Sequence, residues 1–134
     1  PREEVDRVIR MAGLEDLIRE KGEDYLCGEN GNGLSGGEKQ RISIARALLR
    51  NTKVLLVDEA TAALDAETSN KVINAILNLE DITRIIVTHD LDESTLRKYD
   101  SILTLKGGEI TEEGDFETLM QKKGYFYSLF MLSQ

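Results

Sequence analysis

The chain has 134 residues, about the size of one ordinary domain, and its apolar content of 40% is enough to build a core. Its formal net charge of −8 argues against a nucleic-acid-binding surface, because contacts to a phosphate backbone need clustered Lys and Arg. No stretch approaches the roughly 20 continuous apolar residues of a membrane-spanning helix. A single cysteine excludes an internal disulfide, and a single histidine argues against a histidine-based metal site.

The first fifty residues are predicted to be largely helical. Apolar residues at helical spacing predict a helix over 3–12 and a shorter one that ends near Gly22. The glycine-rich run 23–33 predicts an exposed loop, and composition alone favours a flexible linker there. Ser35, followed three residues later by Glu38, predicts a capping box at the start of the next helix.

Two apolar runs separated by a helical pattern form the centre of the chain. The run Val54–Val57 predicts a strand buried on both faces, as in a parallel sheet, and residues 84–88 repeat this pattern. Asp65 is expected to cap the helix between them. In such a βαβ unit both strands end at one edge of the sheet, where open α/β sheets bind ligands. The residues that follow the two strand ends are Asp58, Glu59 and His89.

The last third of the chain predicts a short helix, a hairpin and two further helices. The short helix is expected over 92–98, and a glycine turn at 106–108 is typical of a hairpin between neighbouring strands. The aromatic residues of the tail are expected to pack on the core rather than form a cofactor site; they include Phe116, Tyr125, Phe126 and Phe130. No internal repeat, low-complexity tract or domain boundary is evident.

The strand ends carry groups that suit nucleotide hydrolysis. Asp58 can hold Mg²⁺, usually through its water shell, and Glu59 can polarise the attacking water. His89 can hydrogen-bond the γ-phosphate and that water. A histidine at a strand end is commonly structural, but its place directly after an apolar strand favours the catalytic role here. The capped helix start at Gly36 and Gly37 offers amides and a partial positive charge to a phosphate.

Four motifs resemble those of ABC-type ATPases, in the order and spacing of that family. Leu34–Glu38 resembles the signature motif, Val54–Glu59 the Walker B strand, Ala63–Asp65 the D-loop and His89 the switch histidine. The resemblance covers essentially the whole chain. It implies an α/β fold with a partial P-loop NTPase-like parallel sheet, flanking helices and a C-terminal β-hairpin. Within one ATPase domain, about 1–50 would be the helical subdomain and signature helix, and about 51–134 the Walker B and switch core.

The resemblance also implies a role for each site residue. Asp58 would serve Mg²⁺, Glu59 would be the catalytic base and His89 would sense the γ-phosphate. The residues implied to contact ATP held by a second ABC ATPase subunit, in a head-to-tail dimer, are Ser35, Gly36, Gly37 and Glu38, with Asp65 at the dimer seam. The alanine at position 60 and the loop around Glu29 resemble the exporter branch, in which this loop contacts the transmembrane domains.

The chain departs from the family pattern in three ways. Glu38 stands where glutamine is commoner, Ala62 stands where the D-loop often has serine, and no Gly-x-x-x-x-Gly-Lys-Ser/Thr loop is found. The sequence therefore predicts the C-terminal portion of an exporter ATPase domain at the cytoplasmic face of the membrane. There it would couple ATP hydrolysis to transport. Alone it is expected to be inactive, and to self-associate through exposed strand edges and apolar faces.

Two alternatives stay open at this point. The first is a non-transport ABC ATPase of DNA repair or translation, which the acidity and the loop around Glu29 oppose. Nucleic-acid binding that weakens with salt would favour it. The second is a catalytically silent regulatory fragment, which intact Glu59 and His89 oppose. The transported substrate cannot be read from this segment, because selectivity belongs to transmembrane helices.

Overall fold

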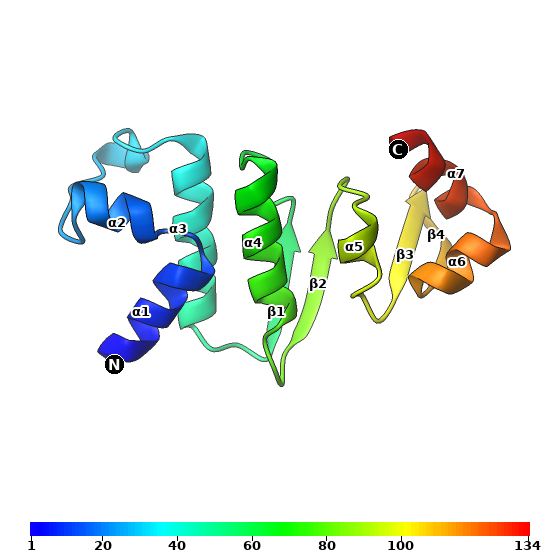
Figure 1. The fold of residues 1–134 in the computed structure, drawn as a ribbon, viewed down its shortest axis with the longest axis horizontal. Helices are drawn as coiled ribbons and strands as arrows, with labels where there is room; N and C mark the ends of the chain where they lie inside the picture. Colours follow the sequence, from blue (N-terminus) through cyan, green and yellow to red (C-terminus); the bar gives the residue numbers. More distant parts are fainter. The chain divides into compact units, whose positions relative to one another are not determined.

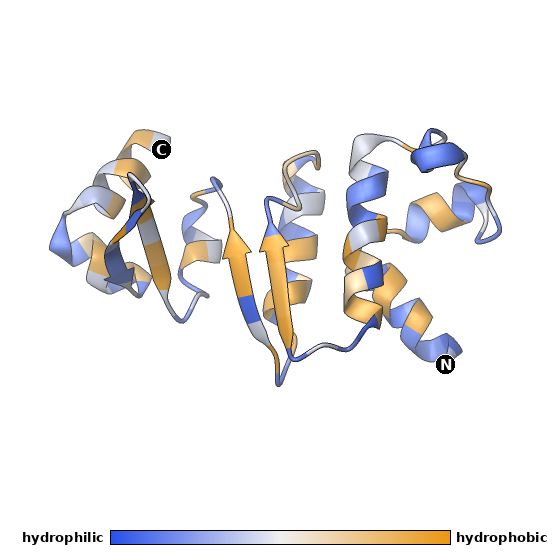
Figure 2. Cartoon of the chain, turned by 180° about the vertical axis from the view of Figure 1, so that it is seen from behind, coloured by the Kyte–Doolittle hydropathy of each residue, from blue (hydrophilic) through white to orange (hydrophobic).

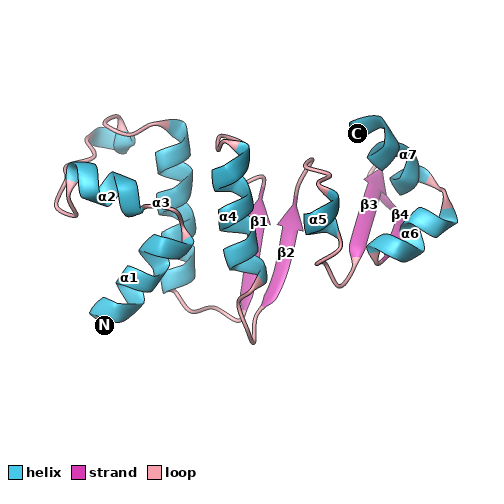
Figure 3. Cartoon of the chain, in the orientation of Figure 1, coloured by secondary structure: helices cyan, strands magenta, loops and turns pink.

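The computed structural model describes residues 1–134, which form two compact units, Pro1–Val87 and Thr88–Gln134 (Figure 1). The first unit contains α1 (Arg2–Met11), α2 (Glu15–Lys21), the 3-10 turn η1 (Glu29–Gly31), α3 (Gly36–Leu49), β1 (Val54–Asp58), α4 (Ala66–Leu77) and β2 (Thr83–Val87). The second contains α5 (Glu93–Leu96), β3 (Ile102–Lys106), β4 (Glu109–Gly114), α6 (Phe116–Lys122) and α7 (Tyr125–Ser133), as Figure 3 shows. This order confirms the predicted α/β class, while the assignment of residues 1–50 and 51–134 to two parts of one domain stays a prediction. None of the helices is both long and apolar enough to cross a bilayer.

Strands β1 and β2 are hydrogen-bonded side by side and run parallel. Their register pairs Val54 with Thr83 at one end and Asp58 with Val87 at the other. The connection between them is α4, whose first turn Asp65 caps by accepting a hydrogen bond from the amide of Thr68. The predicted βαβ unit is therefore confirmed, and both of its strands end at the same edge of the sheet.

The core of the first unit lies between its helices and one face of this sheet. Leu55 and Val57 of β1 are buried against that core, which also contains Val8, Ala12, Ile44, Val72 and Ile76 from the helices. The opposite face is exposed: Leu56 retains 66% of its accessible surface and Ile85 retains 53%. Figure 2 shows the two apolar strands in front of α4. The predicted burial on both faces is wrong within this chain, because alternate side chains of a strand point to opposite faces and only one face is covered.

The second unit is built around the β3–β4 hairpin. Its strands pair antiparallel, with Lys106 opposite Glu109, so Gly107 and Gly108 form a two-residue turn in which both have positive φ, 61° and 82°. Three tail aromatics pack beside the hairpin. The ring of Phe116 lies 6.1 Å from that of Phe126 and 5.3 Å from that of Phe130, both edge to face. This confirms the expectation that these aromatics form core.

A buried acid holds the start of α7. The carboxylate of Glu112, on β4, accepts a hydrogen bond of 2.6 Å from the amide of Phe126, and Glu112 is only 7% exposed. Gly124 leaves the space for this carboxylate, since a β-carbon at that position would collide with it. The helix end is thus satisfied from a strand rather than from its own N-cap residue.

Candidate functional site

The start of α3 is organised by a reciprocal capping box. The amide of Glu38 donates to Ser35 Oγ at 3.2 Å, and the amide of Ser35 donates to Glu38 Oε2 at 2.7 Å. This confirms the predicted cap and shows that Glu38 serves the helix itself. The amides of Gly36 and Gly37 belong to the first turn, where an α-helix provides no carbonyl partner. An exposed helix end of this kind suits a phosphate.

The same helix end lies against the turn that follows β1. A β-carbon on Gly37 would be 3.1 Å from the carbonyl oxygen of Ala63 and 3.2 Å from Leu64 Cδ2. One helical turn further on, Gln40 Oε1 accepts a hydrogen bond of 3.2 Å from the amide of Ala63. Sequence analysis missed Gln40, although its spacing from Gly36 and Gly37 places it on the same face of the helix.

Asp58 and Glu59 are both exposed at the end of β1. Asp58 is the last residue of the strand and is paired with Val87, while the amide of Glu59 donates to the Val87 carbonyl at 2.9 Å. The two acids therefore lie at the carboxyl edge of the sheet, where the βαβ pattern predicts them.

Glu59 has a left-handed backbone conformation, with φ of 46°. This region is uncommon for a residue with a side chain and costs of order 1 kcal/mol, so the surrounding structure has to maintain it. Two backbone hydrogen bonds do so: the amide of Glu59 bonds to β2, and its carbonyl accepts from the amide of Ala62 at 3.0 Å. These two hydrogen bonds hold Glu59, a predicted catalytic residue, in a strained conformation that sets the direction in which the chain leaves β1.

His89 is an exposed residue two positions after the end of β2, in the second unit. The turn that contains it is closed by the amide of Asp90, which donates to Thr88 Oγ1 at 3.0 Å. The parallel pairing of β1 with β2 confirms that the strand preceding His89 ends beside Asp58. The contact of His89 with a nucleotide stays a prediction.

Asp65 has its carboxylate engaged at the start of α4. It accepts hydrogen bonds from the amide of Thr68 at 2.9 Å and from the Thr68 hydroxyl at 2.7 Å, and these lower the pKa of Asp65. The side chain is otherwise exposed. Its local role is therefore that of a helix cap, and its predicted place at a dimer seam remains a prediction.

The loop around Glu29 is compact, unlike the flexible linker that composition favours. The amide of Gly33 donates to the carbonyl of Cys27 at 2.8 Å, which closes the loop on itself around η1. Glu29 is exposed, and Leu26 keeps 89% of its surface accessible. A closed loop that presents an acid and a leucine to the outside is suited to contact another protein surface.

The residues present fit a magnesium site shared with a phosphate better than one made by protein alone. No group of three or more His, Cys, Asp or Glu side chains lies close enough together to hold a metal ion. Mg²⁺ in phosphate-transferring sites takes one or two carboxylates and completes its coordination with water and phosphate oxygens. Asp58, exposed at a strand end, can supply one such carboxylate.

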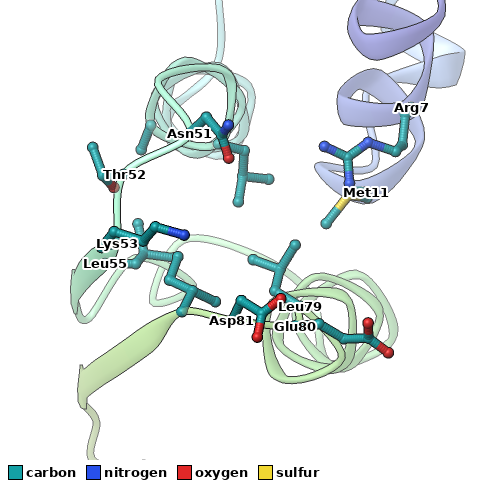
Figure 4. A pocket seen from close by; sticks show the side chains of 12 residues that line it. Arg7, Met11, Asn51, Thr52, Lys53, Leu55, Leu79, Glu80 and Asp81 are labelled. Carbon is teal, nitrogen blue, oxygen red and sulfur yellow. The ribbon is translucent and has the colours of Figure 1, made fainter.

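A cavity of about 330 Å³ lies in the first unit, at the end of the sheet opposite to Asp58 (Figure 4). Its lining includes Lys53 and Leu55 at the start of β1 and Asp81 shortly before β2. None of the predicted site residues lines it. The candidate site is therefore the exposed carboxyl edge of the sheet rather than this cavity.

Comparisons with known proteins agree on one family. A sequence model described as "ABC transporter" matches residues 1–62. The chain is 45% identical over 130 residues to a β-(1→2)glucan export ATP-binding/permease protein of Bartonella bacilliformis, covering 95% of this chain and 22% of that protein. It is 47% identical to ATP-binding cassette sub-family B member 5 of Homo sapiens, over 96% of this chain and 10% of that protein. The chain thus spans at most about a fifth of the length of these relatives.

A solved structure extends the likeness to three dimensions. The structure of a bacterial Atm1-family ABC exporter with ATP bound matches 99% of this chain and 24% of its own, with a TM-score of 0.89 and 36% sequence identity. The names of the two sequence relatives and of the structural neighbour all refer to ATP binding or to export. Over nearly its whole length the chain is therefore similar to ABC exporters, and it corresponds to a fragment of their ATP-binding domain.

Proposed function

We propose that, in the whole exporter, this segment contributes to two different ATP-hydrolysing sites. The start of α3 would belong to one site, and the ends of β1 and β2 would belong to the other. The observation that carries the proposal is the combination, within one compact unit, of a capped helix start at Gly36 and Gly37 with two carboxylates at a strand end. The first feature supplies donors for a phosphate, and the second supplies acids for a metal ion and a water molecule. The named relatives, an export ATP-binding protein and an exporter with ATP bound, support the same chemistry.

The start of α3 would act on the nucleotide of a second ATPase subunit, arranged head to tail. Ser35 and Glu38 keep the first turn of the helix closed, so the amides of Gly36 and Gly37 are held in one direction before a phosphate arrives. Preorganised amides at a helix N-terminus stabilise negative charge without reorganising at the moment of reaction. Asp65 would lie near the seam between the two subunits.

The strand ends would act on the nucleotide of the segment's own subunit. Asp58 would hold Mg²⁺, whose charge offsets that of the phosphate oxygens. Glu59 would accept a proton from the attacking water, and His89 would hydrogen-bond the γ-phosphate. The strained backbone at Glu59 supports this role, because a fixed exit from β1 restricts where its carboxylate can reach.

The loop around Glu29 would contact the transmembrane part of the exporter from the cytoplasmic side. Its closed conformation and the exposed side chain of Leu26 support a role in transmitting motion between the ATPase and the membrane-embedded helices. Substitution of Glu29 by Ala is expected to lower transport more than ATP hydrolysis. Measuring both rates in one preparation of the whole exporter would test this.

The assignment of Glu59 is tested in the whole exporter. Glu59→Gln should abolish steady-state ATP hydrolysis while ATP binding, measured by equilibrium titration, is retained. Glu109→Gln is the matched control, because it makes the same change at an exposed hairpin position. Hydrolysis at the parental rate by the Glu59→Gln protein would contradict the proposed role.

The isolated 134-residue chain should not hydrolyse ATP. Its sequence contains no Gly-x-x-x-x-Gly-Lys-Ser/Thr loop, whose amides and lysine cradle the β- and γ-phosphates in this class of enzyme. A steady-state phosphate-release assay on the purified chain is the measurement. Activity that Glu59→Gln removes would show that the chain binds ATP productively by itself and would overturn this part of the proposal.

A further inference from the structure

Gln40 makes a contact that the roles assigned so far do not use. Its side-chain oxygen accepts a hydrogen bond of 3.2 Å from the amide of Ala63, which is 23 residues further along the chain. Gln40 is half-buried and follows Gly36 and Gly37 by one helical turn. The bond therefore joins the phosphate-binding end of α3 to the residues between β1 and α4.

The two segments also touch through their backbones. A β-carbon on Gly37 would lie 3.1 Å from the Ala63 carbonyl oxygen, and one on Gly36 would lie 3.9 Å from Ala63 Cβ. Because glycine lacks this atom, the start of α3 can approach Ala63 closely, and a side chain at position 37 would push the two segments apart. The hydrogen bond of Gln40 opposes movement of Ala63 away from α3. Together, the close approach at Gly37 and this bond hold Ala63 beside the start of α3.

At its other end, the segment that contains Ala63 begins with Glu59, the proposed catalytic base. Residues 59–64, called here the 59–64 turn, contain two short-range backbone bonds: the amide of Ala62 donates to Glu59 and that of Leu64 donates to Thr61, both at 3.0 Å. The amide of Glu59 in turn bonds to the end of β2 at 2.9 Å. These bonds connect Ala63 to Glu59 through the backbone of one short, hydrogen-bonded turn.

We infer that Gln40 is a positioning residue that holds the 59–64 turn, and through it the carboxylate of Glu59, in a fixed place relative to the start of α3. The consequence for hydrolysis rests on the proposed function. In that setting one side chain couples the group that acts on the partner subunit's nucleotide to the base that acts on the segment's own nucleotide. Loss of the bond loosens the turn and leaves the phosphate-binding amides intact.

The contact itself is tested by amide hydrogen exchange of the 134-residue chain, followed at Ala63 by NMR. Gln40→Met, which keeps the length but removes the acceptor, should speed exchange at Ala63 by about threefold to tenfold, as expected for one lost hydrogen bond. Gln40→Glu keeps an acceptor and should restore slow exchange. Gln121→Met, the same change on α6, is the control and should leave Ala63 unaffected. Parental exchange in Gln40→Met would overturn the inference.

The catalytic consequence is tested in the whole exporter. Gln40→Met should lower kcat by about threefold to tenfold and leave KM for ATP unchanged. The reason is that the lost hydrogen bond helps to stabilise the transition state of hydrolysis and does not contribute to ATP binding. Gln40→Glu should recover the rate. A raised KM at constant kcat, or failure of Gln40→Glu to recover kcat, would overturn the positioning role. The Glu59→Gln variant is assayed beside them: if it hydrolyses ATP normally, the proposed function fails, while exchange at Ala63 still decides whether Gln40 holds the turn.

Discussion

Arg84, on β2, donates hydrogen bonds to backbone carbonyls at the C-terminal end of α4. Replacing it should lower the free energy of unfolding. Its Nη1 atom lies 2.9, 2.5 and 2.8 Å from the carbonyl oxygens of Ile76, Leu77 and Leu79. Carbonyls in the last turn of a helix generally lack a partner within the helix, and a cation is favourable there. The Ile76 carbonyl also accepts a hydrogen bond of 3.3 Å from the amide of Leu79. The Nη1 atom of Arg84 carries two protons, so three contacts amount to two full hydrogen bonds.

The magnitude follows from that count. A hydrogen bond to a charged group contributes about 1.5–3 kcal/mol, and the lower value applies because Arg84 is only half-buried. Arg84→Met should therefore lower the free energy of unfolding by about 3 kcal/mol. Arg84→Lys keeps the charge and at least one donor, so about half of this loss should be recovered.

Urea unfolding of the 134-residue chain, followed by helical circular dichroism, measures these differences. Arg46→Met is the matched control, because Arg46 is exposed on α3 and the substitution is the same. A loss below about 1 kcal/mol for Arg84→Met, or an equal loss for Arg46→Met, would show that the three carbonyls are solvated without the guanidinium and that the reasoning is wrong.

Three further predictions concern other parts of the fold. Gly124→Ala should lower the stability of the chain by about 1–3 kcal/mol in urea unfolding, since its methyl group displaces the carboxylate of Glu112; an unchanged midpoint would contradict this. The hydrogen bonds that cap α6 lower the pKa of Asp115, so its stabilisation is complete above the unfolded pKa and is lost as pH falls through the folded value. Asp115→Asn should flatten the acid side of the stability profile, and an unaltered profile would refute this. The chain should self-associate through its exposed sheet face, and Leu56→Lys with Ile85→Lys should reduce this in light scattering; a compact monomer of the parent would count against it.

Local signals in the sequence were sufficient for most element boundaries. Ser35 and Asp65 mark the starts of α3 and α4 because a short polar side chain satisfies an amide of the first turn, and both caps are confirmed. Gly107 and Gly108 predict the hairpin because both adopt positive φ. The carboxylates after β1 could be located in the same way, since parallel strands end at one edge.

Features that depend on distant residues could not be predicted. The apolar run of β1 indicates two buried faces, but actual burial depends on which layers the chain itself supplies, and Leu56 is exposed. The contact of Gln40 with Ala63 and the cap that Glu112 provides to α7 join residues 23 and 14 positions apart. No local pattern encodes such pairs. They result from the packing of whole elements.

At Glu59, the left-handed backbone conformation lowers the stability of the fold, while the side chain is the proposed catalytic base. Glycine adopts this conformation without penalty, so Glu59→Gly would relieve strain while removing the proposed base. Selection for a more stable fold alone would thus favour loss of the carboxylate. Position 59 is therefore a poor target for stabilisation by design, because the substitution that relieves the strain also removes the proposed base.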